Sequence, residues 1–194
     1  MMSNQSQTHS VNSSTKPVVA PLLQASSRVQ FVTMTLLGSV LLAASAQVQV
    51  PLLPVPMTMQ PFALMVLGLV CHWRLAMTIT MTYLLEGAAG LPVFAGFTSG
   101  IAITHTMGYL LGFVPQVVLI SLLAQRCIGK PYELLRQIGA LLAGQAVLYC
   151  CGVAWLASLV GLKTALLVGV VPFLPMVPVK MFFALAVARS CRRS

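Results

Sequence analysis

Long apolar runs divide the chain into segments of membrane-spanning length. An α-helix rises 1.5 Å per residue, so roughly 17 to 20 apolar residues cross a hydrocarbon core about 30 Å thick. Six segments reach that length, and a shorter apolar stretch at 162–171 is a candidate re-entrant lead-in to the last of them. We therefore predict an all-α protein with six transmembrane helices, at residues 29–46, 57–73, 75–91, 108–124, 139–160 and 172–188.

The two ends of the chain differ from this apolar body. Residues 1–28 are rich in Ser, Gln and Thr, and the first apolar run begins only at Val29. A secretory signal has its apolar core nearer the start. We expect residues 1–28 to form a disordered cytoplasmic tail, residues 29–189 to form the transmembrane domain, and residues 190–194 to form a short basic cytoplasmic tail.

Composition supports a membrane protein and argues against catalysis. The chain is 58% hydrophobic and only 7% charged, with a mean hydropathy of +0.94, whereas soluble domains carry about 25% charged residues. The two acidic residues, Glu86 and Glu133, are predicted on opposite sides of the membrane, so they cannot form an acid/base pair. The five cysteines lack zinc-ligand spacing with the histidines. We expect neither an enzyme nor a metal or cofactor site.

The basic residues indicate how the chain is oriented. They give a formal charge of +9 but are spread singly between apolar runs, which disfavours nucleic-acid binding and fits the positive-inside rule. With a cytoplasmic N-terminus, the outer loops hold only Lys163, whereas nine basic residues lie inside: Lys16, Arg28, Arg74, Arg126, Lys130, Arg136, Arg189, Arg192 and Arg193. We predict a multi-pass protein of the plasma membrane, surrounded by lipid, with both termini in the cytoplasm.

The predicted outer connections are apolar and rich in Pro and Gly. They comprise residues 47–61, 91–105 and 161–178. Irregular backbone at membrane depth is tolerated where it is buried in protein or lines a cavity. These connections therefore favour a lidded pocket that opens outward, and the alternative is plain surface loops.

Lys180 is the most informative charge because it lies within a predicted span. A Lys at mid-span costs about 2.5–3.5 kcal/mol on insertion scales and marks a functional site by default. If its helix begins near Pro178, the ammonium lies beside the free N–H groups of the first turn, and together they suit a carboxylate-bearing ligand. The length needed for a span favours a start nearer Pro172. The alternative is a Lys that snorkels to the interface.

Glu86 and a small-residue stripe leave alternatives open. Glu86 can pair with Lys180, bind a polar ligand group or contact interfacial water, and we favour an interfacial or structural role. Ser39 and Ala43 have the four-residue spacing that lets helices approach closely. They pack against either a partner protein's helix or, more commonly, a neighbour within the bundle.

Other polar residues are candidates for lining a pocket. Tyr109 and Tyr149 have hydroxyl groups that need partners when buried, and position alone does not separate pocket from packing roles. Polar groups on or beside the outer connections are Thr58, Gln60, Ser99 and Thr106. A few such groups among apolar walls describe a small-ligand site. The chain has no GxxxxGK motif followed by Ser or Thr, so energy for pumping would come from a partner or an ion gradient.

Four stretches of the chain form an ordered set of motifs. They are AQVQVPLLPVPMTMQ at 46–60, YLLEGAAGLPVFAG at 83–96, GYLLGF at 108–113, and PFLP at 172–175 leading to Lys180. A weaker fifth motif is Tyr149-x-x-Gly152-x-x-Trp155. In order and spacing these stretches resemble the BioY family, the biotin-specific substrate-binding (S) components of energy-coupling factor (ECF) transporters.

The resemblance implies a six-helix S-component bundle that holds biotin at its outer side. It also implies partners, namely a transmembrane coupling subunit and two ABC ATPases that supply ATP hydrolysis, or else action alone or as a homo-oligomer. Carried over position by position, the ligand-binding residues are Thr58, Gln60, Phe94, Gly96, Ser99, Gly100, Tyr109, Tyr149 and Lys180.

Two positions depart from the family pattern. Val177 stands where the pattern Pro-x-Asp-x-x-Lys has Asp, so a polar group near the ligand is missing. Residues 105–109 read HTMGY where the family favours PTGGY. The alternatives to biotin uptake are an S component for a different vitamin and, much less favoured, a membrane-embedded enzyme.

Overall fold

The computed structural model describes residues 27–52, 55–100, 105–126 and 131–193. Within these residues the protein is mostly helical, with one small hairpin of two strands and one short 3-10 helix. The elements in chain order are α1 Arg28–Gln47, β1 Gln49–Val50, β2 Met57–Thr58, α2 Gln60–Val70, α3 Trp73–Ala88, the 3-10 helix Ala95–Phe97, α4 Met107–Gln125, α5 Glu133–Val160, α6 Leu162–Gly169 and α7 Met176–Arg193.

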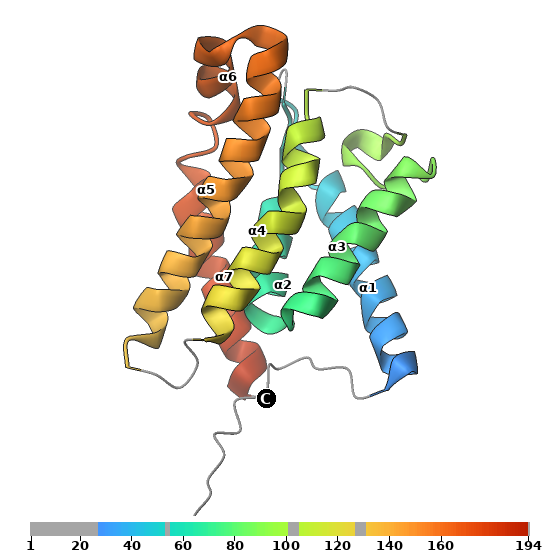
Figure 1. Cartoon of the computed structure of the whole chain (residues 1–194), viewed down its shortest axis with the longest axis vertical. Coiled ribbons are helices and arrows are strands. Elements are labelled where there is room, and N and C mark those ends of the chain that lie inside the picture. The colour runs from blue at the N-terminus through green and yellow to red at the C-terminus, as the bar shows by residue number, and fades with distance from the viewer. Residues whose placement is uncertain (1–26, 53–54, 101–104, 127–130, 194) are drawn as a thin grey trace, which may run out of the picture.

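The long helices stand side by side and alternate in direction (Figure 1). The helices α1, α3 and α5 begin at the lower end of the view, and α7 ends there. Helices α4 and α5 pack along much of their length, α1 packs on α3, and α7 packs on α2. The short helix α6 lies at the opposite end (Figure 1).

Three of the described helices are long and apolar enough to cross a membrane: α1, α4 and α5. The first begins where Ser27 caps it, since the Ser27 hydroxyl accepts a hydrogen bond from the Gln30 amide at 3.2 Å. Hydroxyl groups inside α1 bond to its own backbone, as Thr35 does to the Phe31 carbonyl at 2.8 Å. Such bonds let polar side chains reside in an apolar helix. The predicted spans at 29–46 and 108–124 match α1 and α4 closely.

The predicted helix at 57–73 is wrong at both ends. Met57 and Thr58 are extended and pair with Val50 and Gln49 in an antiparallel hairpin. The helix α2 covers only 11 residues, with Pro61 in its first turn, where the missing N–H is tolerated. It stops at Cys71, whose carbonyl oxygen accepts hydrogen bonds from Ser121 and Gln125 of α4.

Other helix boundaries in the structure also differ from the predicted ones. The helix α5 begins at Glu133, six residues before the predicted start at 139. The candidate re-entrant stretch at 162–171 contains a separate helix, α6, and the last helix runs from Met176 to Arg193 rather than 172–188. The predicted N-terminal tail lies outside the described residues except for Ser27 and Arg28.

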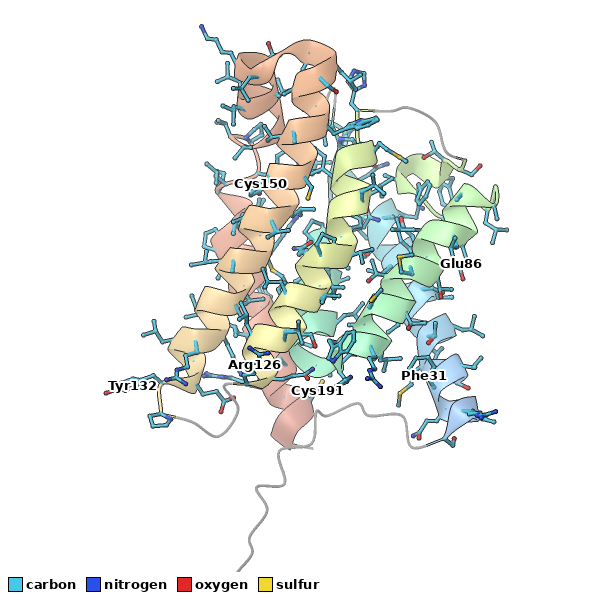
Figure 2. The ribbon with its side chains drawn as sticks, viewed as in Figure 1. Phe31, Glu86, Arg126, Tyr132, Cys150 and Cys191 are labelled. Carbon is cyan, nitrogen blue, oxygen red and sulfur yellow. The ribbon has the colours of Figure 1, made fainter. Side chains whose placement is uncertain are left out.

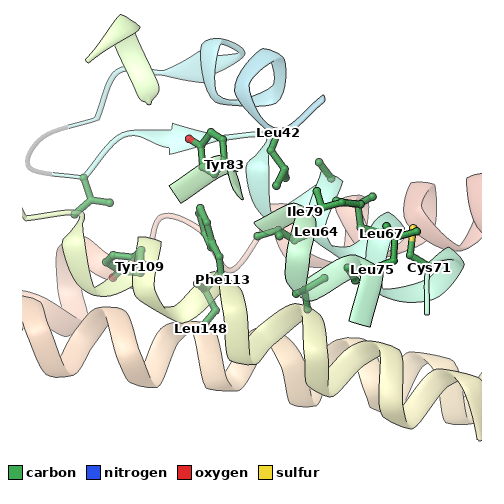
Figure 3. Close-up of a cluster of buried hydrophobic side chains, with 14 of the residues drawn as sticks. Leu42, Leu64, Leu67, Cys71, Leu75, Ile79, Tyr83, Tyr109, Phe113 and Leu148 are labelled. Carbon is green, nitrogen blue, oxygen red and sulfur yellow. The ribbon is translucent and has the colours of Figure 1, made fainter. Parts of the chain in front are cut away.

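The interior is formed by two clusters of buried apolar side chains. One joins α1 through α6 and includes Leu42, Ile79, Tyr83 and Phe113 (Figure 3). The other joins α2, α4, α5 and α7. Close packing at membrane depth is the main source of helix association in lipid, where the hydrophobic effect between helices is absent.

The small-residue stripe of α1 packs within the bundle. Ser39 is 1% exposed, and its hydroxyl donates a hydrogen bond to Glu86 Oε1 of α3 at 3.0 Å. Ala43 packs against the first core cluster. The Glu86 carboxylate (labelled in Figure 2) therefore links two helices, which is the structural role favoured from the sequence.

The outer surface of the helices is apolar. On α1 the side chains of Leu37 and Val40 are 67% and 64% exposed, and on α7 Phe182 is 69% exposed. Such surfaces on several helices are typical of a protein surrounded by lipid. The chain is accordingly a multi-pass membrane protein.

Candidate functional site

A cavity of about 890 Å³ opens among α2, α3, α4, α5 and the start of α7. Most of its wall is apolar, formed by side chains such as Leu84, Phe113 and Leu148. Figure 3 shows Tyr109, Phe113 and Leu148 where α4 meets α5. The volume lies in the range of small-molecule sites, which combine apolar walls with a few placed polar groups.

Lys180 is a principal polar group of this cavity. It lies in the second turn of α7, which begins at Met176 after a series of turns through residues 170–175. Its Nζ atom donates a hydrogen bond to the main-chain carbonyl oxygen of Thr58 at 2.8 Å. This contact holds the ammonium against the hairpin at the cavity wall, so Lys180 does not snorkel outward. Glu86 bonds to Ser39, and the Glu86–Lys180 pair considered from the sequence does not form.

A buried chain of hydrogen bonds supports the hairpin next to Lys180. The Thr58 hydroxyl donates to Gln60 Oε1 at 3.1 Å, and Gln60 Nε2 donates to the Tyr83 hydroxyl at 2.6 Å. Tyr83 in turn donates to the Val93 carbonyl oxygen at 3.2 Å. Thr58 and Gln60 line the cavity, and Tyr83, fully buried behind them, was not singled out from the sequence.

The connection after α3 forms another side of the cavity. Phe94, Ser99 and Gly100 line it, whereas Gly96 does not. The Phe94 ring lies over Gly87 of α3, where an added Cβ would come within 2.1 Å of the ring. Gly96 has a φ of 70° and turns the segment, which explains a glycine there without a ligand contact.

Side-chain contacts from α1 fasten this connection. Gln47 Nε2 donates to the Phe94 carbonyl oxygen at 3.0 Å, and Gln47 Oε1 accepts from the Phe97 amide at 3.2 Å. One amide side chain thus satisfies a backbone donor and a backbone acceptor. The contact fixes the segment 94–97 at the end of α1.

The two candidate tyrosines both line the cavity. The Tyr109 hydroxyl donates to the Gly169 carbonyl oxygen of α6 at 2.8 Å, so its polar group is already engaged. Its ring fits over Gly152 of α5, where an added Cβ would lie 2.2 Å from the ring. Tyr109 therefore acts as a fixed wall, and Tyr149 projects from α5 into the same space.

The BioY family model matches residues 14–194. The chain belongs to the BioY family.

Relatives agree with this assignment over most of their length. The chain is 34% identical over 142 residues to the probable biotin transporter BioY of Rickettsia prowazekii, covering 72% of this chain and 71% of that protein. It is 36% identical over 143 residues to that of Pyrococcus horikoshii, covering 74% and 84%. The biotin transporter BioY of Thermotoga maritima is 34% identical over 151 residues, covering 76% and 87%.

A solved structure has the same fold. The crystal structure at 2.1 Å of the S-component for biotin from an ECF-type ABC transporter superposes with a TM-score of 0.76. The match covers 89% of this chain and 95% of that chain at 19% identity. The arrangement of helices is therefore that of an S component.

Val177, one of the two places where the chain departs from the BioY sequence pattern, lines the cavity one helical turn before Lys180. An apolar side chain therefore faces the site at the position where that pattern has Asp. At the other departure, Thr106 lines the cavity and His105 does not.

Gln145 is a lining residue that sequence reasoning missed. It is 5% exposed, lies within α5, and accepts a hydrogen bond from Gln116 of α4 at 3.3 Å. An uncharged amide inside an apolar span was a usable signal, because polar side chains in spans are commonly functional. Phe173, Met65 and Pro115 also line the cavity, but apolar residues and Pro give no such signal.

Proposed function

We propose that this BioY-family protein captures biotin at the outer side of the membrane and mediates its uptake. The single observation that carries the proposal is the Lys180 ammonium held by the Thr58 carbonyl oxygen beside a largely apolar cavity. An ammonium has three donors, and Thr58 takes one, so others can bind the biotin carboxylate. The apolar wall suits the hydrocarbon and thioether parts of biotin.

We propose that Thr58, Gln60, Phe94, Ser99, Gly100, Tyr109, Tyr149 and Lys180 surround the ligand. All eight line the cavity. Thr58 and Gln60 also keep the hairpin in place through the Tyr83 hydrogen bond. Gly96 shapes the connection rather than touching the ligand. The protein needs no resident metal or cofactor for this role.

Six membrane spans with both termini in the cytoplasm are part of the proposal. The helices α1, α2, α3, α4, α5 and α7 alternate in direction (Figure 1), as six successive spans must. Arg126, Tyr132 and Cys191 lie toward one end (Figure 2), whereas α6, the helix that contains Lys163, lies at the other (Figure 1). Basic residues concentrate at the first end, which the positive-inside rule places in the cytoplasm.

Energy for uptake comes from outside this chain in our proposal. The sequence has no nucleotide-binding loop of the GxxxxGK type. The S-component fold supports assembly with a transmembrane coupling subunit and two ABC ATPases. The alternative arrangement is function alone or as a homo-oligomer, and co-purification from the native membrane separates the two.

The proposal is tested by binding of labelled biotin to the purified protein in nanodiscs. Lys180→Met keeps an unbranched side chain only one atom shorter and removes the charge, and Lys163→Met is the matched control at an exposed position of α6. Loss of a hydrogen bond to a charged group, worth about 1.5–3 kcal/mol, predicts a roughly tenfold to hundredfold weaker Kd for Lys180→Met only. A well-folded wild type that binds no biotin would overturn the proposal and call for a panel of other vitamins.

A further inference from the structure

Two glutamine side chains meet where α4 and α5 pack together. Gln116 of α4 is 0% exposed and Gln145 of α5 is 5% exposed. Gln116 Nε2 donates a hydrogen bond to Gln145 Oε1 at 3.3 Å. Gln145 lies 12 residues from the start of α5, or roughly 18 Å along the helix, so this pair lies deep between the two ends of the bundle.

The pair is not explained by packing alone. Two amides can close two reciprocal hydrogen bonds, yet this pair makes one, and Gln116 Oε1 has no hydrogen-bond partner among the described residues. A buried polar group without its partner destabilises a protein, and apolar side chains of the same shape would avoid this penalty. Polar residues inside a span are therefore candidates for a functional role.

The geometry of the pair presents a hydrogen-bond donor to the cavity. Gln145 lines the cavity, whereas Gln116 lies behind it. Because Gln145 Oε1 accepts from Gln116, the Gln145 amide is held in one orientation, with its Nε2 group as the donor end. Tyr149, one helical turn further along α5, also lines the cavity, and its hydroxyl accepts a hydrogen bond from the Gln145 amide. An amide NH2 group has two donors, so the second N–H of Gln145 remains for an acceptor on the ligand.

The surroundings of Gln145 select an uncharged acceptor. Apart from the uncharged Tyr149, the wall near Gln145 on its own helix is apolar at Leu148, and Phe113 and Pro115 of α4 line the same cavity. No charged residue other than Lys180 lines the cavity among the described residues. An amide donor in such a setting suits a carbonyl group, because an anion would lack a counter-charge there. Lys180, on the separate helix α7, provides the counter-charge for an anionic group.

We propose that Gln145, positioned by Gln116, donates a hydrogen bond from Nε2 to the ureido carbonyl oxygen of biotin. This inference rests on the proposed function, in which Lys180 binds the carboxylate. Different side chains of the cavity then bind the two polar ends of biotin: the neutral amide of Gln145 binds the urea, and the ammonium of Lys180 binds the carboxylate. Gln116 is a positioning residue that does not touch the ligand.

The test compares three probes: biotin, 2-iminobiotin and biotinamide. In 2-iminobiotin a protonated imine replaces the ureido carbonyl, so a donor would face the Gln145 donor. In biotinamide the carboxylate is neutral and the urea is intact. The variants are Gln145→Leu and the isosteric Gln145→Glu. The matched control is Gln137→Leu on the same helix, since Gln137 is 2% exposed but does not line the cavity.

The expected result is a change in discrimination at one end of the ligand only. Gln145→Leu weakens biotin binding about tenfold or more and shrinks the preference for biotin over 2-iminobiotin. Gln145→Glu shifts that preference toward 2-iminobiotin, because a carboxylate accepts from the cationic guanidine. Gln116→Leu reduces the preference partially. The preference for biotin over biotinamide stays at the wild-type ratio in all of these variants, and Gln137→Leu matches the wild type throughout.

Each contrary outcome has a distinct meaning. If the wild type binds biotin and both Gln145 variants keep the wild-type preference over 2-iminobiotin, the inference is wrong and the proposed function stands. If the folded wild type binds no biotin, the proposed function fails. If Gln145→Leu does not fold, which its thermal unfolding beside Gln137→Leu reveals, the isosteric Gln145→Glu decides the question through its probe preference.

Discussion

The Nζ atom of Lys180 lies 2.8 Å from the main-chain carbonyl oxygen of Thr58, a residue 122 positions earlier in the chain. This hydrogen bond ties the start of α7 to the hairpin that precedes α2. It brings the cation predicted inside the last span to the wall of the cavity. The same hairpin depends on the hydrogen bonds from Thr58 through Gln60 to Tyr83.

We expect Tyr83→Phe to destabilise the protein without removing a ligand contact. Gln60 Nε2 would lose its acceptor while 4% exposed, and an unsatisfied buried group costs about 1–3 kcal/mol. Thermal unfolding in detergent measures the effect. The matched control is Tyr132→Phe, since Tyr132 is 78% exposed. Equal unfolding temperatures for the two variants would show that the Tyr83 hydroxyl does not support the hairpin.

Gly152→Ala is expected to disturb the cavity through Tyr109. The added methyl group would lie 2.2 Å from the Tyr109 ring, so the ring must move and its bond to the Gly169 carbonyl oxygen is strained. Overpacking of this kind costs about 1–3 kcal/mol. We expect lower stability and weaker biotin binding, measured by thermal unfolding and by titration.

Gly139→Ala is the control for that change on the same helix. Nothing lies within 4 Å of the new Cβ at position 139. Replacing Gly by Ala inside a helix stabilises it by up to about 1 kcal/mol. A Gly152→Ala protein as stable as Gly139→Ala would contradict the close approach of Tyr109 to α5.

Gln47→Ala is expected to loosen the segment 94–97 beside the cavity. The variant removes both hydrogen bonds that fasten this segment to α1. Each bond contributes about 0.5–1.5 kcal/mol, so we expect biotin to dissociate roughly tenfold faster. Release of labelled biotin after dilution measures the rate. Gln47→Glu keeps the acceptor for the Phe97 amide, so its dissociation rate should lie between those of the wild type and Gln47→Ala. An unchanged rate in both variants would show that Gln47 does not hold the segment 94–97 for binding.

The proposed orientation is checked with single cysteines in a cysteine-free background. Lys163→Cys, on α6, should react with a membrane-impermeant maleimide in intact cells. Arg74→Cys, at the start of α3, should react only after the cells are permeabilised. Both positions are exposed, so access to the reagent depends on the side of the membrane. The reverse labelling pattern would place the cavity opening on the cytoplasmic side.

The sequence alone determined the features that depend on local composition. The length of an apolar run sets whether a helix can form and span, so α1 and α4 were located within one or two residues. Lys180 stood out because any cation in such a run is costly. The ordered motifs were enough to identify the family whose model matches residues 14–194. Eight of the nine carried-over residues line one cavity.

Tertiary structure decided what each of these residues faces. The run at 57–73 is mostly apolar and was predicted as one helix, yet Met57 and Thr58 pair with a strand because residues 49 and 50 lie beside them. Gly96 shares a motif with Phe94 but turns away from the cavity. Gln116 and Gln145 are 29 residues apart, and only the packing of α4 on α5 joins them. Apolar periodicity is a property of neighbouring residues, whereas a binding site arises from contacts between distant segments, which one sequence does not encode locally.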